Sequence, residues 1–164
     1  MNRHTVLAAI DAETYREVCS HFCTGVAVAT VRAVDASPHG LTVSTFTPVS
    51  LDPPLVLICI DLACTVAGHF VAATHFAINV LTDAQRELSV GFAARPEGRF
   101  EGVAWRPGAT GAPLLEGSLA TLECTLQRVI EVGDHAVVVG LIVSAASYSG
   151  EPLLYYKRAY RTLL

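Results

Sequence analysis

Runs rich in Val, Ile, Leu and Ala recur along the chain between short polar stretches that contain Gly, Pro, Asp and Ser. This pattern predicts β-strands joined by turns. The expected strands occupy residues 26–34, 41–49, 55–60, 76–81, 118–131 and 135–149, with a short last strand over 153–156. Val132, Gly133 and Asp134 separate the two longest runs, which predicts a hairpin between them.

Helical patterns are confined to three segments. Asp11 can cap a helix that continues to about residue 22, with an apolar stripe at i, i+3, i+4 and i+7 formed by Tyr15, Val18, Cys19 and Phe22. Thr82 and Gln85 form a capping-box pattern that opens a helix ending near residue 94. A third, short helix is expected over residues 65–73.

The order of these elements decides between fold classes. Strands and helices do not alternate regularly, and no Gly-x-Gly-x-x-Gly fingerprint is present, which argues against a doubly wound parallel sheet. Residues 35–40 predict a turn, and residues 95–111, rich in Gly and Pro, predict a long loop. We therefore expect a mainly β, antiparallel barrel of about six strands with two or three flanking helices. Residues 1–164 are expected to form a single domain, with its core over about 15–160.

Composition adds an expected subunit interface. The chain is 52% apolar and 16% charged, whereas an ordinary soluble domain carries roughly 25% charged residues. The longest apolar stretch without a charge, residues 136–148, is shorter than the roughly 20 residues that a membrane-spanning helix needs. We therefore expect the excess apolar surface to lie between subunits, most simply those of a twofold homodimer.

Charge and cysteine usage restrict the partners further. The formal net charge is −4 with no basic run, so no nucleic-acid partner is expected, because phosphate binding needs a positive surface. Residues 1–10 lack the apolar core of a signal peptide. The five cysteines are odd in number, and neither they nor the histidines show a metal-ligand spacing. We expect reduced, mostly buried thiols, no metal and a cytoplasmic protein.

The candidate binding segment spans residues 40–54, where five hydroxyl side chains lie within nine positions: Thr42, Ser44, Thr45, Thr47 and Ser50. Hydroxyl groups and free loop N–H groups are neutral donors to a phosphate or to a ribityl chain, and this segment has no Lys or Arg. The alternative interpretation is an edge strand that is rich in Thr because of its β propensity.

This segment resembles the signature of the short-chain flavin reductases, the reductase components of two-component flavin-dependent monooxygenases. That signature has the form G-[ML]-T-[AV]-[NS]-[AS]-F-[TS]-S-V-S-[LI]-x-P-P. Similar motifs follow in family order in residues 22–28 (FCTGVAV), 76–81 (FAINVL), 102–105 (GVAW), 111–115 (GAPLL), 122–124 (LEC), 133–135 (GDH) and 152–156 (PLLYY). The resemblance covers about residues 15–160. Ser44 stands where Asn is common in the family, and Pro48, which has neither N–H nor hydroxyl, stands where Ser is usual.

The resemblance implies a split β-barrel with Greek-key-like connections and a homodimer with flavin at the subunit interface. It implies hydride transfer from NADH or NADPH to FMN or FAD, and supply of the reduced flavin to a partner monooxygenase. It also implies that the flavin contacts Thr42, Val43, Ser44, Thr45, Thr47 and Ser50. Further contacts to the flavin are expected from Asn79, Val80 and Leu81. Phe92 and Arg95 are expected to reach its phosphate or an adenosine end.

His135 is the candidate catalytic residue. The resemblance puts the corresponding histidine beside the flavin ring, near where the nicotinamide stacks. Its imidazole is expected to orient the carboxamide or to stabilise charge on the reduced ring. The alternative is a turn histidine bonded to its own backbone. Tyr155, Tyr156 and Tyr160 are expected to pack in the core or interface, or to place one ring at the edge of the nicotinamide pocket.

Three other functions stay open at this point: a non-catalytic flavin-binding split barrel, an oxidase that resembles pyridoxamine-phosphate oxidases, and a purely structural dimerisation module. Such oxidases typically place basic residues on the phosphate, and residues 42–50 contain none. The sequence therefore favours the reductase over the oxidase.

Overall fold

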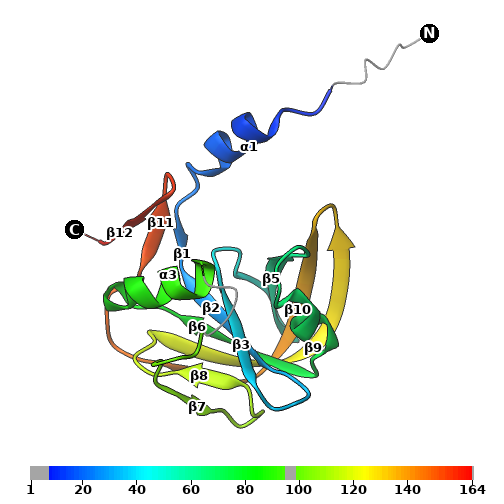
Figure 1. Cartoon of the computed structure of the whole chain (residues 1–164), viewed down its shortest axis with the longest axis vertical. Coiled ribbons are helices and arrows are strands. Elements are labelled where there is room, and N and C mark those ends of the chain that lie inside the picture. The colour runs from blue at the N-terminus through cyan, green and yellow to red at the C-terminus, as the bar shows by residue number, and fades with distance from the viewer. Residues whose placement is uncertain (1–7, 95–98, 164) are drawn as a thin grey trace.

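A curled, seven-stranded antiparallel sheet forms the body of the computed structural model, which describes residues 8–94 and 99–163 (Figure 1). Its strands are hydrogen-bonded in the order β3-β2-β6-β9-β10-β5-β4. Their bounds are β2 (Ala27–Arg32), β3 (Pro38–Val43), β4 (Thr47–Leu51), β5 (Pro54–Asp61), β6 (His75–Val80), β9 (Ala120–Val132) and β10 (His135–Ser147).

Two small sheets and the helices complete the fold. One sheet joins β1 (Thr24–Gly25), β11 (Leu154–Tyr156) and β12 (Ala159–Arg161), and the other joins β7 (Trp105–Pro107) and β8 (Pro113–Leu115). The helices are α1 (Ala12–Cys19), α2 (Ala67–Ala72), α3 (Arg86–Ala94) and the single 3₁₀ turn η1 (Asp83–Gln85). Figure 1 shows α1 standing off the barrel beside the β11–β12 hairpin, while the β9–β10 hairpin projects on the other side.

The barrel core follows from strand alternation. Along β5 the side chains of Val56, Ile58 and Ile60 are buried, while Leu57 and Cys59 between them are only partly covered. Successive strand residues point to opposite faces, so one face of β5 fills the core and the other remains accessible.

A close crossing inside the core requires a glycine in β10. A Cβ atom at Gly140 would lie 2.5 Å from Cζ of Phe76 and 2.8 Å from Cβ of Cys124. Both neighbours are fully buried, so neither can move aside in a close-packed interior. Gly140 therefore lets β10 pass directly over the Phe76 ring.

Most predicted elements are confirmed. Asp11 caps α1 by accepting a hydrogen bond from the Thr14 N–H at 2.8 Å, and the Thr82–Gln85 capping box is present. The mainly β, antiparallel class, the helices near 67–72 and 86–94, the β9–β10 hairpin and β11 also agree with the sequence pattern. The barrel sheet has seven strands, close to the six expected, and the two small sheets bring the described residues to twelve strands, several of them only two or three residues long.

Four of the predicted elements have wrong boundaries. The expected strand over 41–49 is interrupted at residues 44–46, because the Thr45 side chain bonds to the backbone of Cys59 where backbone pairing would continue the ladder. β3 starts at Pro38, inside the expected turn 35–40, and the described part of the expected loop 95–111 contains β7. The first helix ends at Cys19, three residues before its expected end.

None of the helices in the described part of the chain combines the length and the apolar content that crossing a membrane requires.

Candidate active site

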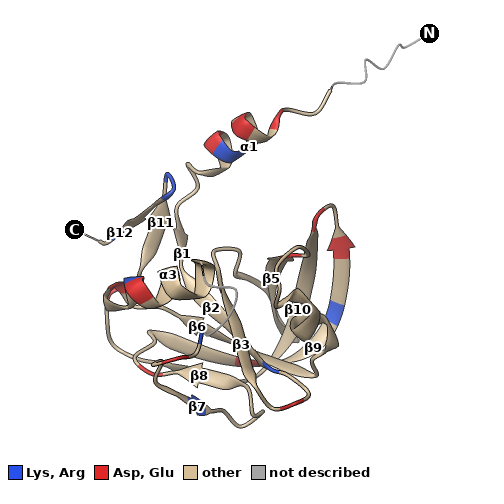
Figure 2. Ribbon diagram, in the orientation of Figure 1, with Lys and Arg blue, Asp and Glu red and all other residues tan. Residues whose placement is uncertain are grey.

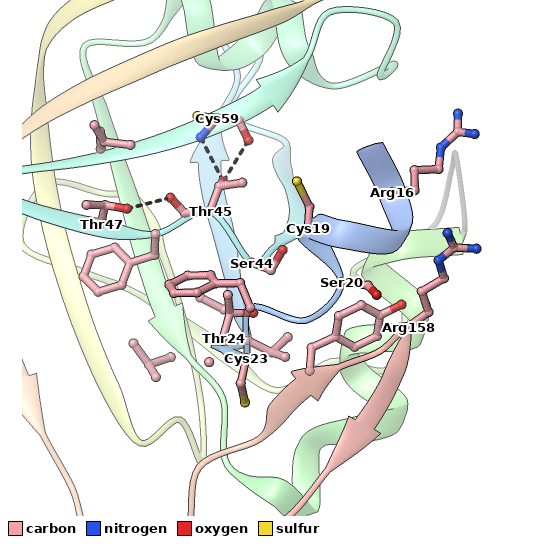
Figure 3. Close-up of a pocket in the computed structure, with 18 of the residues that line it drawn as sticks. Arg16, Cys19, Ser20, Cys23, Thr24, Ser44, Thr45, Thr47, Cys59 and Arg158 are labelled. Carbon is pink, nitrogen blue, oxygen red and sulfur yellow. Dashed lines mark hydrogen bonds between the residues drawn. The ribbon is translucent and has the colours of Figure 1, made fainter. Parts of the chain in front are cut away.

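A cavity of about 900 Å³ opens between α1, β1, the turn after β3, the outward face of β5 and the β11–β12 hairpin (Figure 3). Aromatic and apolar residues make much of its wall: Tyr15, Phe22, Val26, Ala27, Phe46, Leu57, Val80 and Tyr155. Hydroxyl and thiol groups add Cys19, Ser20, Cys23, Thr24, Ser44, Thr45, Thr47 and Cys59. Such a wall suits a flat aromatic group that also carries polar edges.

The hydroxyl-rich turn is fixed to the cavity wall by Thr45. Its Oγ1 accepts a hydrogen bond from the Cys59 N–H at 2.9 Å and donates one to the Cys59 carbonyl at 3.1 Å. The Thr47 hydroxyl donates to the carbonyl of Thr45 at 3.4 Å. Ser44, Thr45 and Thr47 are therefore held at the cavity by their own local bonds rather than by a regular strand (Figure 3).

The sheet face beside the cavity extends toward His135. Directly paired residues point to the same side of a sheet, and the pairs are Thr47 with Leu57, Val137 with Cys59, and His135 with Asp61. His135 does not line the cavity of the single subunit, but it lies on the same sheet face as Cys59, two residues farther along. Two residues along a strand span about 7 Å, so His135 lies one strand over and about that far along the sheet from Cys59.

His135 is oriented by its neighbour in the turn. Its Nδ1 lies 2.7 Å from Oδ1 of Asp134, and 43% of its side chain is exposed. The hydrogen bond from the His135 ring lowers the pKa of Asp134. An Nδ1 that donates to this carboxylate leaves Nε2 as the outward-facing nitrogen. The ring is thus bonded to a side chain, whereas the alternative interpretation expected a bond to its own backbone.

Two arginines line the cavity, and the sequence interpretation missed both. Arg16 comes from α1 and Arg158 from the turn of the β11–β12 hairpin, and their side chains extend on the same side of the cavity (Figure 3). Within the described part of the chain, no Asp or Glu lines it. Figure 2 shows one basic segment between acidic ones on α1 and another basic segment at the tip of the β11–β12 hairpin. The cavity therefore suits an anionic group although the chain carries a net charge of −4.

A backbone bond brings the two arginines together across the chain. The N–H of Lys157 donates to the carbonyl of Ser20, the residue that caps α1, at 2.9 Å. Lys157 and Arg158 have φ angles of 48° and 58°, and two consecutive left-handed residues make the tight turn of a hairpin. From the sequence, Arg95 was the basic residue expected at the phosphate, and no local signal pointed to Arg16 and Arg158.

Four of the residues predicted for flavin contact line the cavity: Ser44, Thr45, Thr47 and Val80. The others in the described ranges do not: Thr42, Val43, Ser50, Asn79, Leu81 and Phe92. Arg95 lies outside the described residues. Tyr155 is the one of the three C-terminal tyrosines at the cavity.

Asn79 is occupied inside the barrel. Its Nδ2 donates to the Val28 carbonyl and to the Thr30 hydroxyl, both at 3.1 Å, and its Oδ1 accepts from the Leu115 N–H at 2.8 Å. With a fully buried side chain, its amide joins β6 to β2 and β8. A contact from this side chain to a ligand in the cavity is therefore excluded in this conformation.

Thr42 and Phe92 likewise serve the packing of α3. The Thr42 hydroxyl donates to the Ser89 carbonyl at 2.6 Å. The Phe92 ring is buried between Gly40, where a Cβ would lie only 2.9 Å from Cε1, and the Phe100 ring, with centroids 5.0 Å apart. Val43 and Leu81 are also buried in the core. The predicted contacts from these side chains are replaced by internal ones.

In the described part of the chain, no group of three or more His, Cys, Asp or Glu side chains is arranged to hold a metal ion.

Comparisons with known proteins identify the family of this chain. A model of the flavin reductase like domain family matches residues 19–164. The chain is 38% identical over 156 residues to the reductase subunit HsaB of a flavin-dependent monooxygenase of Mycobacterium tuberculosis, covering 93% of this chain and 83% of that protein. It is 37% identical over 147 residues to the reductase component of the flavin-dependent trigonelline monooxygenase of Acinetobacter baylyi. There it covers 90% of this chain and 47% of that protein, so the chain spans about half the length of that relative.

A solved structure is similar along the whole fold. The NADH:FAD oxidoreductase of Streptomyces globisporus, in complex with NAD and FAD fragments, superposes with a TM-score of 0.88 at 34% identity. The match covers 96% of this chain and 98% of that one. The chain belongs to the flavin reductase family and is an oxidoreductase that acts on flavin.

Proposed function

We propose that this reductase binds FMN or FAD in the cavity between α1 and β5, takes hydride from NADH or NADPH, and delivers the reduced flavin to a monooxygenase. The observation that carries the proposal is the lining of the cavity: aromatic rings, hydroxyl groups and two arginines, with no carboxylate among the described lining residues. A flavin mononucleotide offers the matching groups, namely a flat ring system, a polyhydroxyl chain and a phosphate.

The lining supports one orientation of the flavin. Arg16 and Arg158 are the charged donors for a phosphate or pyrophosphate, because guanidinium groups form strong, charge-assisted bonds with such anions. The isoalloxazine ring then lies toward Phe46, Leu57 and Cys59, on the sheet face that continues to His135. Ser44, Thr45 and Thr47 lie between these ends and suit the ribityl chain and ring edge.

His135 is the proposed nicotinamide-positioning residue. The bound cofactors supply the hydride chemistry, so the protein needs to align two flat rings at near-attack distance, roughly 3–3.5 Å. Asp134 fixes the His135 ring, which leaves Nε2 for the carboxamide of the nicotinamide or for a polar edge of the flavin. This role fits a side chain that is half exposed and lies on the same sheet face as Cys59 of the cavity.

A homodimer would complete this site. The sheet face around His135 continues onto β9, where Val132 pairs with His135 and Ile130 with Val137. These two aliphatic side chains are 58% and 42% exposed. Phe22 at the cavity is 78% exposed, and an exposed apolar surface contiguous with a ligand cavity is typical of a subunit interface. The occupant we propose is a second copy of this chain.

Different observations support the proposed monooxygenase partner and the proposed cytoplasmic location. Relatives are reductase subunits of flavin-dependent monooxygenases, which supports a monooxygenase as the acceptor of the reduced flavin. The five cysteines are free thiols, as a reducing compartment such as the cytoplasm would keep them.

The test is anaerobic reduction followed by flavin absorbance. The protein is mixed with each of the four pairings of NADH or NADPH with FMN or FAD, and loss of the visible flavin band is recorded against a sample without protein. We expect rapid bleaching with at least one pairing, and the ratio of the four rates identifies the preferred cofactors. No bleaching with any pairing would overturn the proposed activity.

A further inference from the structure

Three of the five cysteines converge on the cavity. Cys19 is the last residue of α1, Cys23 lies in the turn that follows, and Cys59 lies on the outward face of β5 (Figure 3). Cys19 and Cys23 are exposed and Cys59 is partly covered. The expectation of mostly buried thiols is therefore wrong, because α1 stands off the barrel instead of packing its stripe into the core.

Each wall that carries a thiol is fixed in place. The backbone of Cys59 is bonded on both sides by the Thr45 hydroxyl. The end of α1 is joined to the β11–β12 hairpin by the bond from Lys157 to Ser20. The thiols of Cys19 and Cys59 thus belong to different walls of the cavity. An oxygen added to either sulfur would occupy part of the volume that a ligand needs.

The two remaining cysteines lie outside the cavity and differ in environment. Cys124 is fully buried in the barrel, and desolvation raises the pKa of its thiol to about 12. Cys64 packs against the edge of the main core. A buried thiol with a raised pKa is inert, since the thiolate is the reactive species. Cys124 therefore serves as an unreactive control for the cavity cysteines within the same chain.

We propose that Cys19, Cys23 and Cys59 form a thiol-modification site at which oxidation and flavin binding exclude each other. The proposal rests on the binding of flavin in this cavity. The consequence is regulation by the reduced flavin. When the reductase releases more reduced flavin than its acceptor consumes, oxidation of the cavity thiols would block further flavin binding.

The oxidant is hydrogen peroxide, which forms when free reduced flavin transfers two electrons to dioxygen. A cavity thiolate attacks one peroxide oxygen, an S–O bond forms, the O–O bond breaks, and hydroxide leaves and is protonated to water. The sulfur loses two electrons and becomes a sulfenic acid. Dithiothreitol reduces the sulfenic acid back to the thiol.

Cysteine mapping on the native protein tests the site without any variant. The protein is treated with hydrogen peroxide, then the remaining thiols are alkylated, and the five cysteine peptides are quantified by mass spectrometry with and without flavin. We expect oxidation at Cys19, Cys23 and Cys59, and none at Cys124. Flavin at ten times its dissociation constant should slow cavity oxidation about tenfold, because it leaves about a tenth of the sites open.

Flavin affinity supplies the second measurement. Oxidised protein should bind FMN and FAD at least about tenfold more weakly than untreated protein, and dithiothreitol should restore the affinity. A triple variant, Cys19→Ser with Cys23→Ser and Cys59→Ser, should show the same affinity before and after peroxide, whatever that affinity is. The matched control Cys64→Ser should stay sensitive. If the triple variant does not fold, the three single variants and the native map decide.

The outcomes separate this inference from the flavin site itself. The thiol proposal is overturned if flavin does not slow oxidation of the cavity cysteines and peroxide leaves the flavin affinity unchanged. In that case, a weaker affinity of an Arg16 variant for FMN would still locate the flavin in the cavity. If neither peroxide nor substitution of Arg16 and Arg158 changes flavin affinity, the cavity is not the flavin site, and both proposals fail.

Discussion

The Thr45 hydroxyl holds the Cys59 backbone from both sides, as acceptor from its N–H at 2.9 Å and as donor to its carbonyl at 3.1 Å. One side chain thereby replaces a pair of strand–strand hydrogen bonds at the point where β3 gives way to β4. The same contact fixes the hydroxyl-rich turn against the cavity wall. Stability and ligand binding are therefore coupled through this residue.

Replacing Thr45 by Val should impair both properties. The change keeps the shape of the side chain but leaves the N–H and carbonyl of Cys59 without their partner, at a cost of about 1–3 kcal/mol in the free energy of unfolding. Urea denaturation and flavin titration measure the two effects. Thr45→Ser retains the hydroxyl and is the control. Equal behaviour of the Val and Ser variants would contradict the structural role of the hydroxyl.

Removing either cavity arginine should weaken phosphate recognition selectively. Arg16→Ala or Arg158→Ala should raise the dissociation constant for FMN about tenfold, since a charge-assisted bond to an ionised group is worth about 1.5–3 kcal/mol. The affinity for riboflavin, which has no phosphate, should change little. Arg128→Ala, at an exposed position on β9, is the control. A parallel loss of riboflavin and FMN binding would argue against phosphate contact.

His135→Ala should affect the nicotinamide step more than flavin binding. Misplacing the nicotinamide by about 1 Å can cost up to about a hundredfold in rate, so kcat/KM for NADH should fall by a factor in this range. Asp134→Asn weakens the bond that orients the ring and should give a smaller loss in the same direction. Stopped-flow reduction at saturating flavin separates the two steps. A flavin-binding protein without turnover would show no rate to lose.

Glu123 should make the fold sensitive to acid. Burial raises its pKa, but hydrogen bonds from the Thr110 hydroxyl at 2.6 Å and from the N–H groups of Thr110 and Ala109 at 2.7 and 3.1 Å lower the pKa by more, so the net pKa lies below its usual value. A carboxyl whose pKa is lower in the folded state contributes stability above its unfolded pKa, which is about 4.3. That contribution is lost as the pH falls through the folded pKa.

The measurement is urea unfolding as a function of pH. Glu123→Gln should lose about 1–3 kcal/mol near neutral pH, and the difference from the wild type should shrink below about pH 4. Glu101→Gln, at an exposed position, is the control. If the difference in unfolding free energy between the wild type and Glu123→Gln grew as the pH fell, its pH dependence would have the wrong sign. That result would contradict the role assigned to Glu123.

Charge placed on the β9 face should dissociate the homodimer. Sedimentation of the wild type should give twice the subunit mass of 17.4 kDa. Val132→Glu should shift the mass toward one subunit and reduce flavin affinity, because burying an unpaired carboxylate in an apolar interface is costly. Val34→Glu, in the exposed turn between β2 and β3, is the control. A wild type that sediments as one subunit would refute the interface.

Short sequence patterns predicted the elements that are stabilised by contacts between residues a few positions apart. Asp11 and Thr82 initiate helical turns through side chains that reach backbone groups three residues away, so their caps were visible in the sequence. The β9–β10 hairpin follows from two long aliphatic runs around Gly133. The paired strands β7 and β8 were hidden because each is three residues long and contains proline.

The site was harder to predict because its residues meet through tertiary contacts. Arg16 and Arg158 lie near opposite ends of the sequence, and the bond from Lys157 to Ser20 and the pairing of β1 with β11 bring their segments together. Asn79 was expected at the ligand because of the resemblance to the family. Which partner it finds depends on Leu115 of β8, whose pairing the sequence did not reveal.

The bond between Ser20 and Lys157 has a consequence for biosynthesis. The wall begun by α1 emerges from the ribosome early, whereas Tyr155 and Arg158 are added only after the whole barrel has been translated. A nascent chain can thus close its barrel while the pocket is still missing a side. The cavity wall formed by Tyr155 and Arg158 is therefore the last part of the site to be synthesised.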